Sequence, residues 1–311
     1  MVDRIIATKI IEASTQMPVV AITGPRQSGK STLVRNYFTN YTYTNLEDLE
    51  LRQFAQEDPK GFLENIGEKA IIDEIQQVPS LLSYIQVIVD RNNLPGQYIL
   101  SGSQNLLLME GISQSLAGRV SIFNLLPFSI EELKNTKYHL SDYEDYIFKG
   151  FYPRIYDQSL SPNSWLLNYI QTYVERDLRQ LINVLDLGIF RQFLAVCAGR
   201  IGQLVNFSDI SNVLGISYQT VKRWLSILET SFIIYQLRPY HKNYNKRIVK
   251  SPKLYFYDTG LACALLNILS VEDLNRHFAK GALFENFIIN EIIKNHYNRS
   301  IPIQPYFSSF V

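Results

Sequence analysis

Short runs of apolar and β-branched residues alternate with amphipathic segments along the first 128 residues of the chain. The runs are typical of buried parallel strands and lie at 19–22, 41–45, 70–73, 97–100 and 120–125. The segments with helical periodicity are 3–16, 30–38, 48–57, a helix that restarts at Pro59, 81–89 and 106–116. Because strands alternate with helices, we expect an α/β fold with a five-stranded parallel sheet flanked by helices.

The pattern changes beyond Pro127. Residues 129–200 have helical periodicity, with a break at Gly150–Pro153 and a long helix predicted from Trp165 to Leu185. Two shorter helices are predicted at 207–213 and 218–229, before extended segments at 233–240 and 254–257. This order is typical of a helix-turn-helix with a wing. A last amphipathic helix is predicted at 279–297.

The composition is that of an ordinary globular protein, with 46% hydrophobic and 19% charged residues in a chain of 311. No stretch approaches the roughly 18 apolar residues that cross a bilayer, and the amino terminus lacks the apolar core of a secretory signal. We therefore expect a cytoplasmic protein without a membrane partner. Cys197 and Cys263 each lie alone among apolar residues, which predicts two buried free thiols.

The loop after the first predicted strand matches the pattern G-x-x-x-x-G-K-[ST]. In such a loop successive backbone N–H groups point toward phosphates, and the following helix adds its partial positive charge. We expect Lys30 to reach the β- and γ-phosphates of ATP and the Ser31 hydroxyl to bind Mg²⁺. The predicted nucleotide-binding residues are Gly24, Pro25, Arg26, Gln27, Ser28, Gly29, Lys30, Ser31 and Thr32.

Two acidic residues, Asp73 and Glu74, follow the apolar run Ala70–Ile72. P-loop ATPases hold Mg²⁺ with a carboxylate at the end of a buried strand, so Asp73 is a predicted metal ligand. Glu74 is the predicted general base that activates the attacking water. A strand end followed by a helix cap would place the same residues there, but the neighbouring phosphate-binding loop favours the catalytic interpretation.

Further distinctive motifs lie along the chain: NLED at 45–48, IDEIQ at 72–76, ILSGS at 99–103, LAGR at 116–119, LPFS at 126–129, YVERD at 173–177, KSPKLY at 250–255 and DTGLA at 258–262. With the phosphate-binding loop, they make the chain similar to the AAA+ class of ATPases over residues 15 to about 295. The similarity is closest to prokaryotic AAA-type ATPases with a carboxy-terminal domain of unknown function.

This resemblance implies two further roles. A polar sensor stands at the end of the fourth strand in AAA+ proteins, and Ser103 aligns best with it, with Ser101 as the substitute. An arginine before the fifth strand reaches the nucleotide of a neighbouring subunit, and Arg119 has that position. As such a finger, Arg119 would stabilise charge at the γ-phosphate and require a homo-oligomer. A surface or structural arginine is the alternative.

The module at 206–258 is basic, with 8 Lys and Arg against 3 Asp and Glu, whereas residues 1–128 have 10 against 13. We expect the second helix to present Lys222 and Arg223 outward, and the wing to carry Lys246 and Arg247. These four residues are the candidate DNA contacts, because recognition helices read the major groove and basic wings bind phosphates. A packing module or a lid over the nucleotide is the alternative use of such a fold.

The resemblance also implies a restriction-type nuclease fold toward the carboxyl end, whose first acidic residue corresponds to Glu285. The later Asp and Glu-x-Lys that would hold a metal are missing, so the chain resembles a shortened family member and we expect no nuclease activity. The predicted parts are an ATPase domain at 1–128, a helical lid at 129–205, a winged helix at 206–265 and a remnant of the nuclease-like domain at 266–311.

The sequence thus predicts an enzyme that hydrolyses ATP with Mg²⁺ to drive a conformational change. Two other functions share many of its residues. One is an ATP-dependent switch that does not hydrolyse the nucleotide. The other is a DNA-binding regulator in which the P-loop is regulatory.

Overall fold

The computed structural model describes residues 2–103, 112, 114–174, 187–240, 251–302 and 305–307. It divides the chain into two compact units, residues 1–126 with 296–302 and residues 127–295 with 303–311. In the part of the chain that is described, no helix combines the length and the apolar character needed to cross a bilayer.

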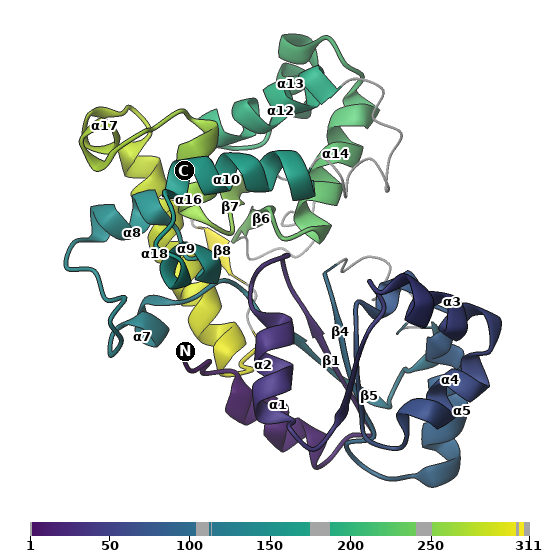
Figure 1. Cartoon of the computed structure of the whole chain (residues 1–311). Coiled ribbons are helices and arrows are strands. Elements are labelled where there is room, and N and C mark those ends of the chain that lie inside the picture. Colours follow the sequence, from purple (N-terminus) through teal and green to yellow (C-terminus); the bar gives the residue numbers. More distant parts are fainter. Residues whose placement is uncertain are drawn as a thin grey trace. The chain divides into compact units, whose positions relative to one another are not determined.

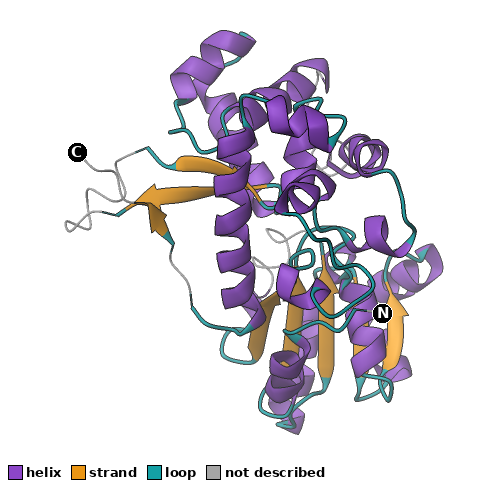
Figure 2. Ribbon diagram, turned by 90° about the vertical axis from the view of Figure 1, so that its left-hand side faces the viewer, coloured by secondary structure: helices purple, strands orange, loops and turns teal. Residues whose placement is uncertain are grey.

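The first unit is built on a five-stranded parallel sheet in the order β2-β3-β4-β1-β5 (Figures 1 and 2). All five strands predicted from apolar runs are present. Their bounds are β1 Val19–Thr23, β2 Thr42–Asn45, β3 Ala70–Asp73, β4 Tyr98–Gly102 and β5 Val120–Asn124. Because β4 lies between β1 and β3, the carboxyl end of β4 separates the loop after β1 from the acidic pair after β3.

Helices cover both faces of this sheet, as expected (Figure 1). They are α1 Ala7–Ser14, α2 Lys30–Tyr37, α3 Leu49–Glu57, α4 Pro59–Ile66 and α5 Leu81–Asn92, with a 3-10 turn, η1, at Ile75–Gln77. Alternate strand residues face opposite sides. Ala21 and Ile72 therefore pack with Phe62 of α4, whereas Ile22 and Ile71 pack with Leu33 of α2. The helix predicted at 106–116 lies mostly outside the described residues.

The second unit is mainly helical. Its helices are α7 Ile130–Leu133, α8 Tyr143–Lys149, α9 Pro153–Asp157, α10 Pro162–Tyr169, α12 Leu187–Gly199, α13 Phe207–Leu214, α14 Tyr218–Thr230, α16 Thr259–Leu265, α17 Val271–Arg276 and α18 Lys280–Asn298, of which the residues from His296 on belong to the first unit. The predicted break at 150–153 is confirmed, since α8 ends at Lys149 and α9 begins at Pro153. The helix expected from Trp165 instead begins at Pro162 and passes into a π-helical turn, η2, at Ile170–Val174, while 175–186 lie outside the described residues.

A small second sheet follows α14. Its strands are β6 Ile234–Pro239, β7 Lys253–Phe256 and β8 Tyr306–Phe307, in the order β7-β6-β8, with β6 and β7 antiparallel. Two helices followed by an antiparallel pair are consistent with the predicted order of elements. The segment between the strands, 241–250, falls outside the described residues, so the winged helix and the boundaries at 205 and 265 stay predictions.

Candidate nucleotide site

The loop between β1 and α2 has the backbone of a phosphate cradle. Gly24, Gln27 and Gly29 have φ values of 149°, 64° and 96°, all in the region that L side chains rarely adopt. Gly29 is the N-cap of α2, so the amino end of that helix opens directly onto the loop. At Gly24 a Cβ atom would lie 2.2 Å from the carbonyl oxygen of Leu125, so the site requires glycine for packing as well as for conformation.

Two polar side chains of this loop, Lys30 and Ser28, are buried from solvent. Lys30 is 6% exposed, and its Nζ donates to the carbonyl oxygens of Gly24 at 2.9 Å and Pro25 at 2.8 Å. The Ser28 hydroxyl is fully buried and has no hydrogen-bond partner among the described residues. A buried polar group without a partner is unfavourable unless a ligand or water satisfies it. The loop therefore fits an anionic phosphate group.

The other predicted loop residues take less central places. Arg26 forms an ion pair with Glu47 at 3.3 Å, and Thr32 is exposed on α2. Arg4, from the segment before α1, anchors the loop by donating to the Ser28 carbonyl oxygen at 2.8 Å and to that of Leu126 at 2.6 Å. Sequence reasoning missed Arg4, which lies far from the motif along the chain.

Asp73 is the last residue of β3. Because the strands are parallel, it lies at the same end of the sheet as the loop after β1. It is 1% exposed, and each carboxylate oxygen accepts hydrogen bonds. Oδ1 accepts from the Ser101 hydroxyl at 2.5 Å and the Glu74 backbone N–H at 3.1 Å, and Oδ2 accepts from the Tyr43 hydroxyl at 2.8 Å. These donors offset the cost of burying the carboxylate.

Glu74 points elsewhere although it is the next residue. Its φ of 55° is left-handed, an uncommon conformation for a residue other than glycine. Its Oε2 accepts from the Ser103 hydroxyl at 3.2 Å and from the Gln76 amide. Sequence reasoning did not identify Gln76 as a partner. Ser101 and Ser103, the two candidate sensors, thus each contact a different member of the acidic pair.

A magnesium ion would find oxygen ligands here, which is the ligand type that Mg²⁺ prefers. The described residues contain no group of three or more His, Cys, Asp and Glu side chains that could hold a metal alone. Asp73 and the Ser31 hydroxyl, the two predicted ligands, therefore suit an ion that takes its remaining ligands from nucleotide phosphates and water.

Arg119 lies at the amino-terminal end of the strands, whereas the phosphate-binding loop lies at their carboxyl-terminal end. It precedes β5, whose first residue Val120 is in register with Val19, whereas the P-loop follows the other end of β1. Five residues at about 3.3 Å each separate the two ends by roughly 16 Å. Arg119 forms a two-point ion pair with Asp90 and donates to the Ala117 carbonyl oxygen at 2.9 Å. This position leaves its own P-loop out of reach, so any finger role would act on another subunit.

The remaining candidates lie in the second unit. Lys222 and Arg223 are exposed on α14, as expected, while Lys246 and Arg247 fall outside the described residues. Glu285 accepts from Lys253 at 3.0 Å and from the Tyr255 hydroxyl at 2.5 Å, and these partners lower its pKa against the opposing effect of burial. The two cysteines are free and buried, as predicted, and burial raises the pKa of the Cys197 thiol to about 12.

Comparison with known sequences gives two family matches. Residues 16–134 match the family described as an AAA domain, and residues 140–272 match a domain of unknown function (DUF8612). An uncharacterized protein of Mycobacterium tuberculosis is 31% identical over 291 residues, which are 92% of this chain and 64% of that protein. An uncharacterized protein of Haemophilus influenzae is 26% identical, and the aligned region includes 90% of this chain and 75% of that protein. The chain thus spans slightly less than two thirds of the length of its mycobacterial relative.

Among solved structures, the Walker-type ATPase of Pyrococcus abyssi has a similar fold, with a TM-score of 0.55 and 16% identity, covering 84% of this chain and 94% of its own. The matched segment 16–134 contains the whole parallel sheet, the loop after β1 and the acidic pair after β3. The candidate site therefore lies within the part of the chain that is similar to AAA domains.

Proposed function

We propose that this protein binds ATP with Mg²⁺ in the loop Gly24–Ser31 and hydrolyses it. The observation that supports this most directly is the separation of the acidic pair: Asp73 and Glu74 are adjacent in sequence but have different hydrogen-bond partners. The two carboxylates can therefore take separate tasks, one at a metal and the other at a water molecule, and phosphoryl transfer to water requires both tasks.

In this proposal Lys30 leaves the loop carbonyls to contact the β- and γ-phosphates, while Ser31 and Asp73 hold Mg²⁺. An ion held by these two residues would supply positive charge next to the phosphates. Glu74 orients a water molecule and takes its proton as the water oxygen bonds to the γ-phosphorus and the bond to the β,γ-bridging oxygen breaks. Ser103, a donor to Glu74, positions that carboxylate, and Ser101 positions Asp73.

The test is steady-state ATP turnover with Mg²⁺, beside equilibrium ATP binding, for the wild type, Glu74→Gln and Lys30→Ala. We expect Glu74→Gln to keep ATP binding and to lose turnover by at least about 100-fold, the size of a general-base contribution. Lys30→Ala should lose both. A wild type that binds ATP without turnover at every protein concentration would instead establish the non-hydrolysing switch.

Oligomerisation is part of the proposal through Arg119. If Arg119 acts on a neighbouring subunit, turnover per chain should rise with protein concentration, and Arg119→Ala should remove that rise. Asp90→Asn is the matched variant, because it breaks the same ion pair and keeps the arginine. A loss of turnover in both variants, independent of concentration, would indicate a structural ion pair.

DNA binding through the module at 206–258 is the second candidate function. It is favoured by two observations on α14: the helix follows α13 after a turn at Gly215, whose φ is 66°, and it exposes Lys222 and Arg223. We expect a DNA affinity that falls with salt concentration and is lost in the double variant Lys222→Gln/Arg223→Gln. Salt-independent binding, or none in the wild type, would exclude this function and leave a packing role.

A further inference from the structure

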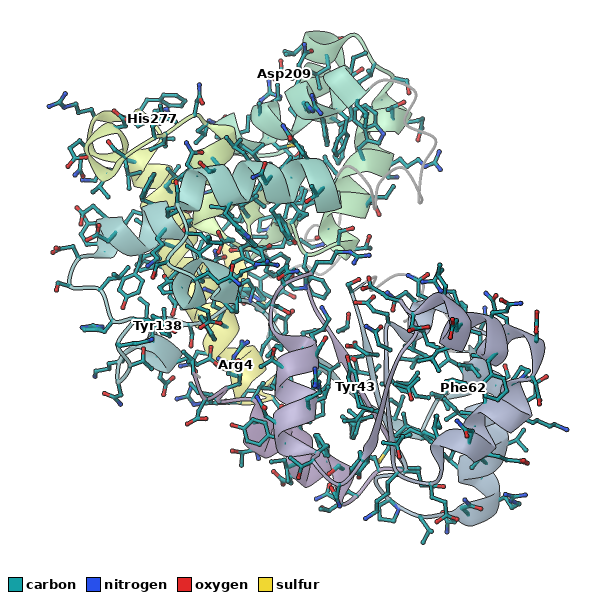
Figure 3. All side chains as sticks on the ribbon, viewed as in Figure 1. Arg4, Tyr43, Phe62, Tyr138, Asp209 and His277 are labelled. Carbon is teal, nitrogen blue, oxygen red and sulfur yellow. The ribbon has the colours of Figure 1, made fainter. Side chains whose placement is uncertain are left out.

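Tyr43 is a residue of the edge strand β2 that no motif singles out, yet it contacts both groups assigned to magnesium. Its hydroxyl donates to Oδ2 of Asp73 at 2.8 Å, and it also shares a hydrogen bond with the Ser31 side chain. Tyr43, labelled in Figure 3, belongs to the first unit. It pairs with Ile71 in the parallel register of β2 and β3, two residues before Asp73. A single phenol oxygen therefore joins the serine of the P-loop to the carboxylate of the neighbouring strand.

The ring of Tyr43 has its own packing. It is partly buried against the apolar cluster beneath α2, and the guanidinium carbon of Arg35 lies 5.0 Å from the ring centroid. Both contacts involve the ring and would survive removal of the hydroxyl. The hydroxyl therefore acts on Asp73: it is one of the donors that offset the burial of this carboxylate, and it fixes the position of Oδ2.

Mg²⁺ demands nearly ideal octahedral geometry with ligand distances of about 2.0–2.1 Å, so a small rotation of a ligand carboxylate weakens binding. Partners behind the ligands set that rotation in metal sites. At Asp73, Ser101 and the Glu74 N–H hold Oδ1, whereas Tyr43 donates to Oδ2. The plane of the carboxylate is therefore defined from both sides.

We propose that Tyr43 is a positioning residue for the magnesium site, an inference that rests on the proposed function. Without nucleotide, the hydroxyl bridges Ser31 and Asp73 and keeps the two ligand groups at one place. With Mg²⁺ and ATP bound, Ser31 would be a ligand of the ion, and the bond from Tyr43 to Oδ2 would hold the orientation of Asp73.

The experiment measures binding of a fluorescent ATP analogue to the full chain, first in EDTA and then across a magnesium titration, for the wild type, Tyr43→Phe and Tyr41→Phe. Tyr41 is the matched control, because it is also a partly buried tyrosine of this unit but donates to the Gly96 carbonyl oxygen, away from the site. Thermal unfolding of each variant verifies that the sheet is intact.

We expect Tyr43→Phe to bind the analogue in EDTA as the wild type does, and to need about 10-fold more Mg²⁺ for half of the magnesium effect, the lower end of the usual loss on removing such a partner. Turnover should recover at high magnesium, and Tyr41→Phe should match the wild type. An unchanged magnesium midpoint in Tyr43→Phe would overturn the inference alone. A wild type without magnesium-dependent binding would overturn the proposed function and this inference together.

Discussion

Ser101 and Ser103 stand two residues apart at the end of β4, and each donates its hydroxyl to a different carboxylate. From the sequence, Ser103 and Ser101 are alternative candidates for a single sensor position. In the structure they are not interchangeable. Ser101 contacts the residue assigned to the metal, and Ser103 contacts the residue assigned to water.

Alanine substitutions at these two positions should therefore have different effects. Ser103→Ala should lower kcat by about 10-fold without changing the magnesium midpoint, because removing a partner that orients a catalytic group typically costs 10–100-fold. Ser101→Ala should raise the magnesium midpoint by about the same factor. Steady-state turnover across a magnesium titration measures both quantities. Equal effects of the two variants on both quantities would show that the serines act on the acidic pair as one unit.

Some residues of the candidate site are recognisable from a local sequence pattern, whereas others depend on contacts between segments that are distant along the chain. Lys30 and Ser31 were predicted because the phosphate-binding loop is a local pattern, Gly24–Ser31, with one backbone function. Asp73 and Glu74 were predictable from an apolar run that ends in two acids. Tyr43, Gln76 and Arg4 were not, because their contacts depend on the register of β2 with β3, on the left-handed φ of Glu74 and on the path of the segment before α1.

At the level of elements, apolar runs predicted the central strands β1, β3 and β4, since buried strands need nearly continuous apolar sequence. The edge strands β2 and β5 are only partly buried, and β2 was predicted from its aromatic and β-branched residues. The order of the strands in the sheet could not be predicted from these runs, because strand order depends on pairing between distant segments. The long helix expected from Trp165 shows the other limit. Its periodicity is helical throughout, but Ile170–Val174 form a π-helical turn, and that small change in hydrogen bonding leaves almost no trace in an apolar pattern.

The N-cap of α16 shows how the DTGLA motif acts on structure. Asp258 is 1% exposed; its Oδ1 accepts from the Leu261 N–H at 3.0 Å and its Oδ2 from the Phe151 N–H at 2.7 Å. At Gly150, whose φ is 69°, a Cβ would lie 2.3 Å from Oδ1. The carboxylate thus joins the start of α16 to the break between α8 and α9, and it explains why that break contains glycine.

Asp258→Ala should destabilise the second unit by about 2–4 kcal/mol, because two buried N–H groups lose their acceptor. Asp258→Asn should cost less, since the amide oxygen still accepts from one of them. Urea unfolding followed by tryptophan fluorescence measures both, because Trp165 and Trp224 belong to this unit. Equal stability of the alanine variant and the wild type would show that water satisfies these groups.

The same carboxyl predicts a pH dependence. Burial raises the pKa of Asp258 above its ordinary value of 3.8, against the opposing effects of Lys294 and the backbone donors. A carboxyl with a raised pKa in the folded state contributes its stability at low pH and loses it as the pH rises through that value. Above pH 3.8 the wild type should therefore lose stability relative to Asp258→Asn. A difference that grows as the pH falls would contradict this assignment.

At the scale of the whole molecule, one of the chain connections between the two units follows Leu126, since the second unit begins at Pro127. Gly24 packs against the Leu125 carbonyl, and Arg4 bridges the carbonyl oxygens of Ser28 and Leu126, the last residue before the second unit begins at Pro127. The phosphate-binding loop is thus in direct contact with the segment that precedes Pro127. Arg4 is the side chain that joins the two.

This contact makes a prediction about energetic coupling. Mg²⁺ and ATP at 100 times Kd should stabilise the first unit by about 2.7 kcal/mol. Both tryptophans belong to the second unit, so a shift of their unfolding transition reports energy transmitted to it. We expect the wild type to show such a shift and Arg4→Met to reduce it while still binding ATP. Lys9→Met is the control, because Lys9 is an exposed cation of α1 that pairs with Glu12. If Arg4→Met shifts as much as the wild type, the coupling does not pass through Arg4, and if the wild type shows no shift, the two units respond to nucleotide independently.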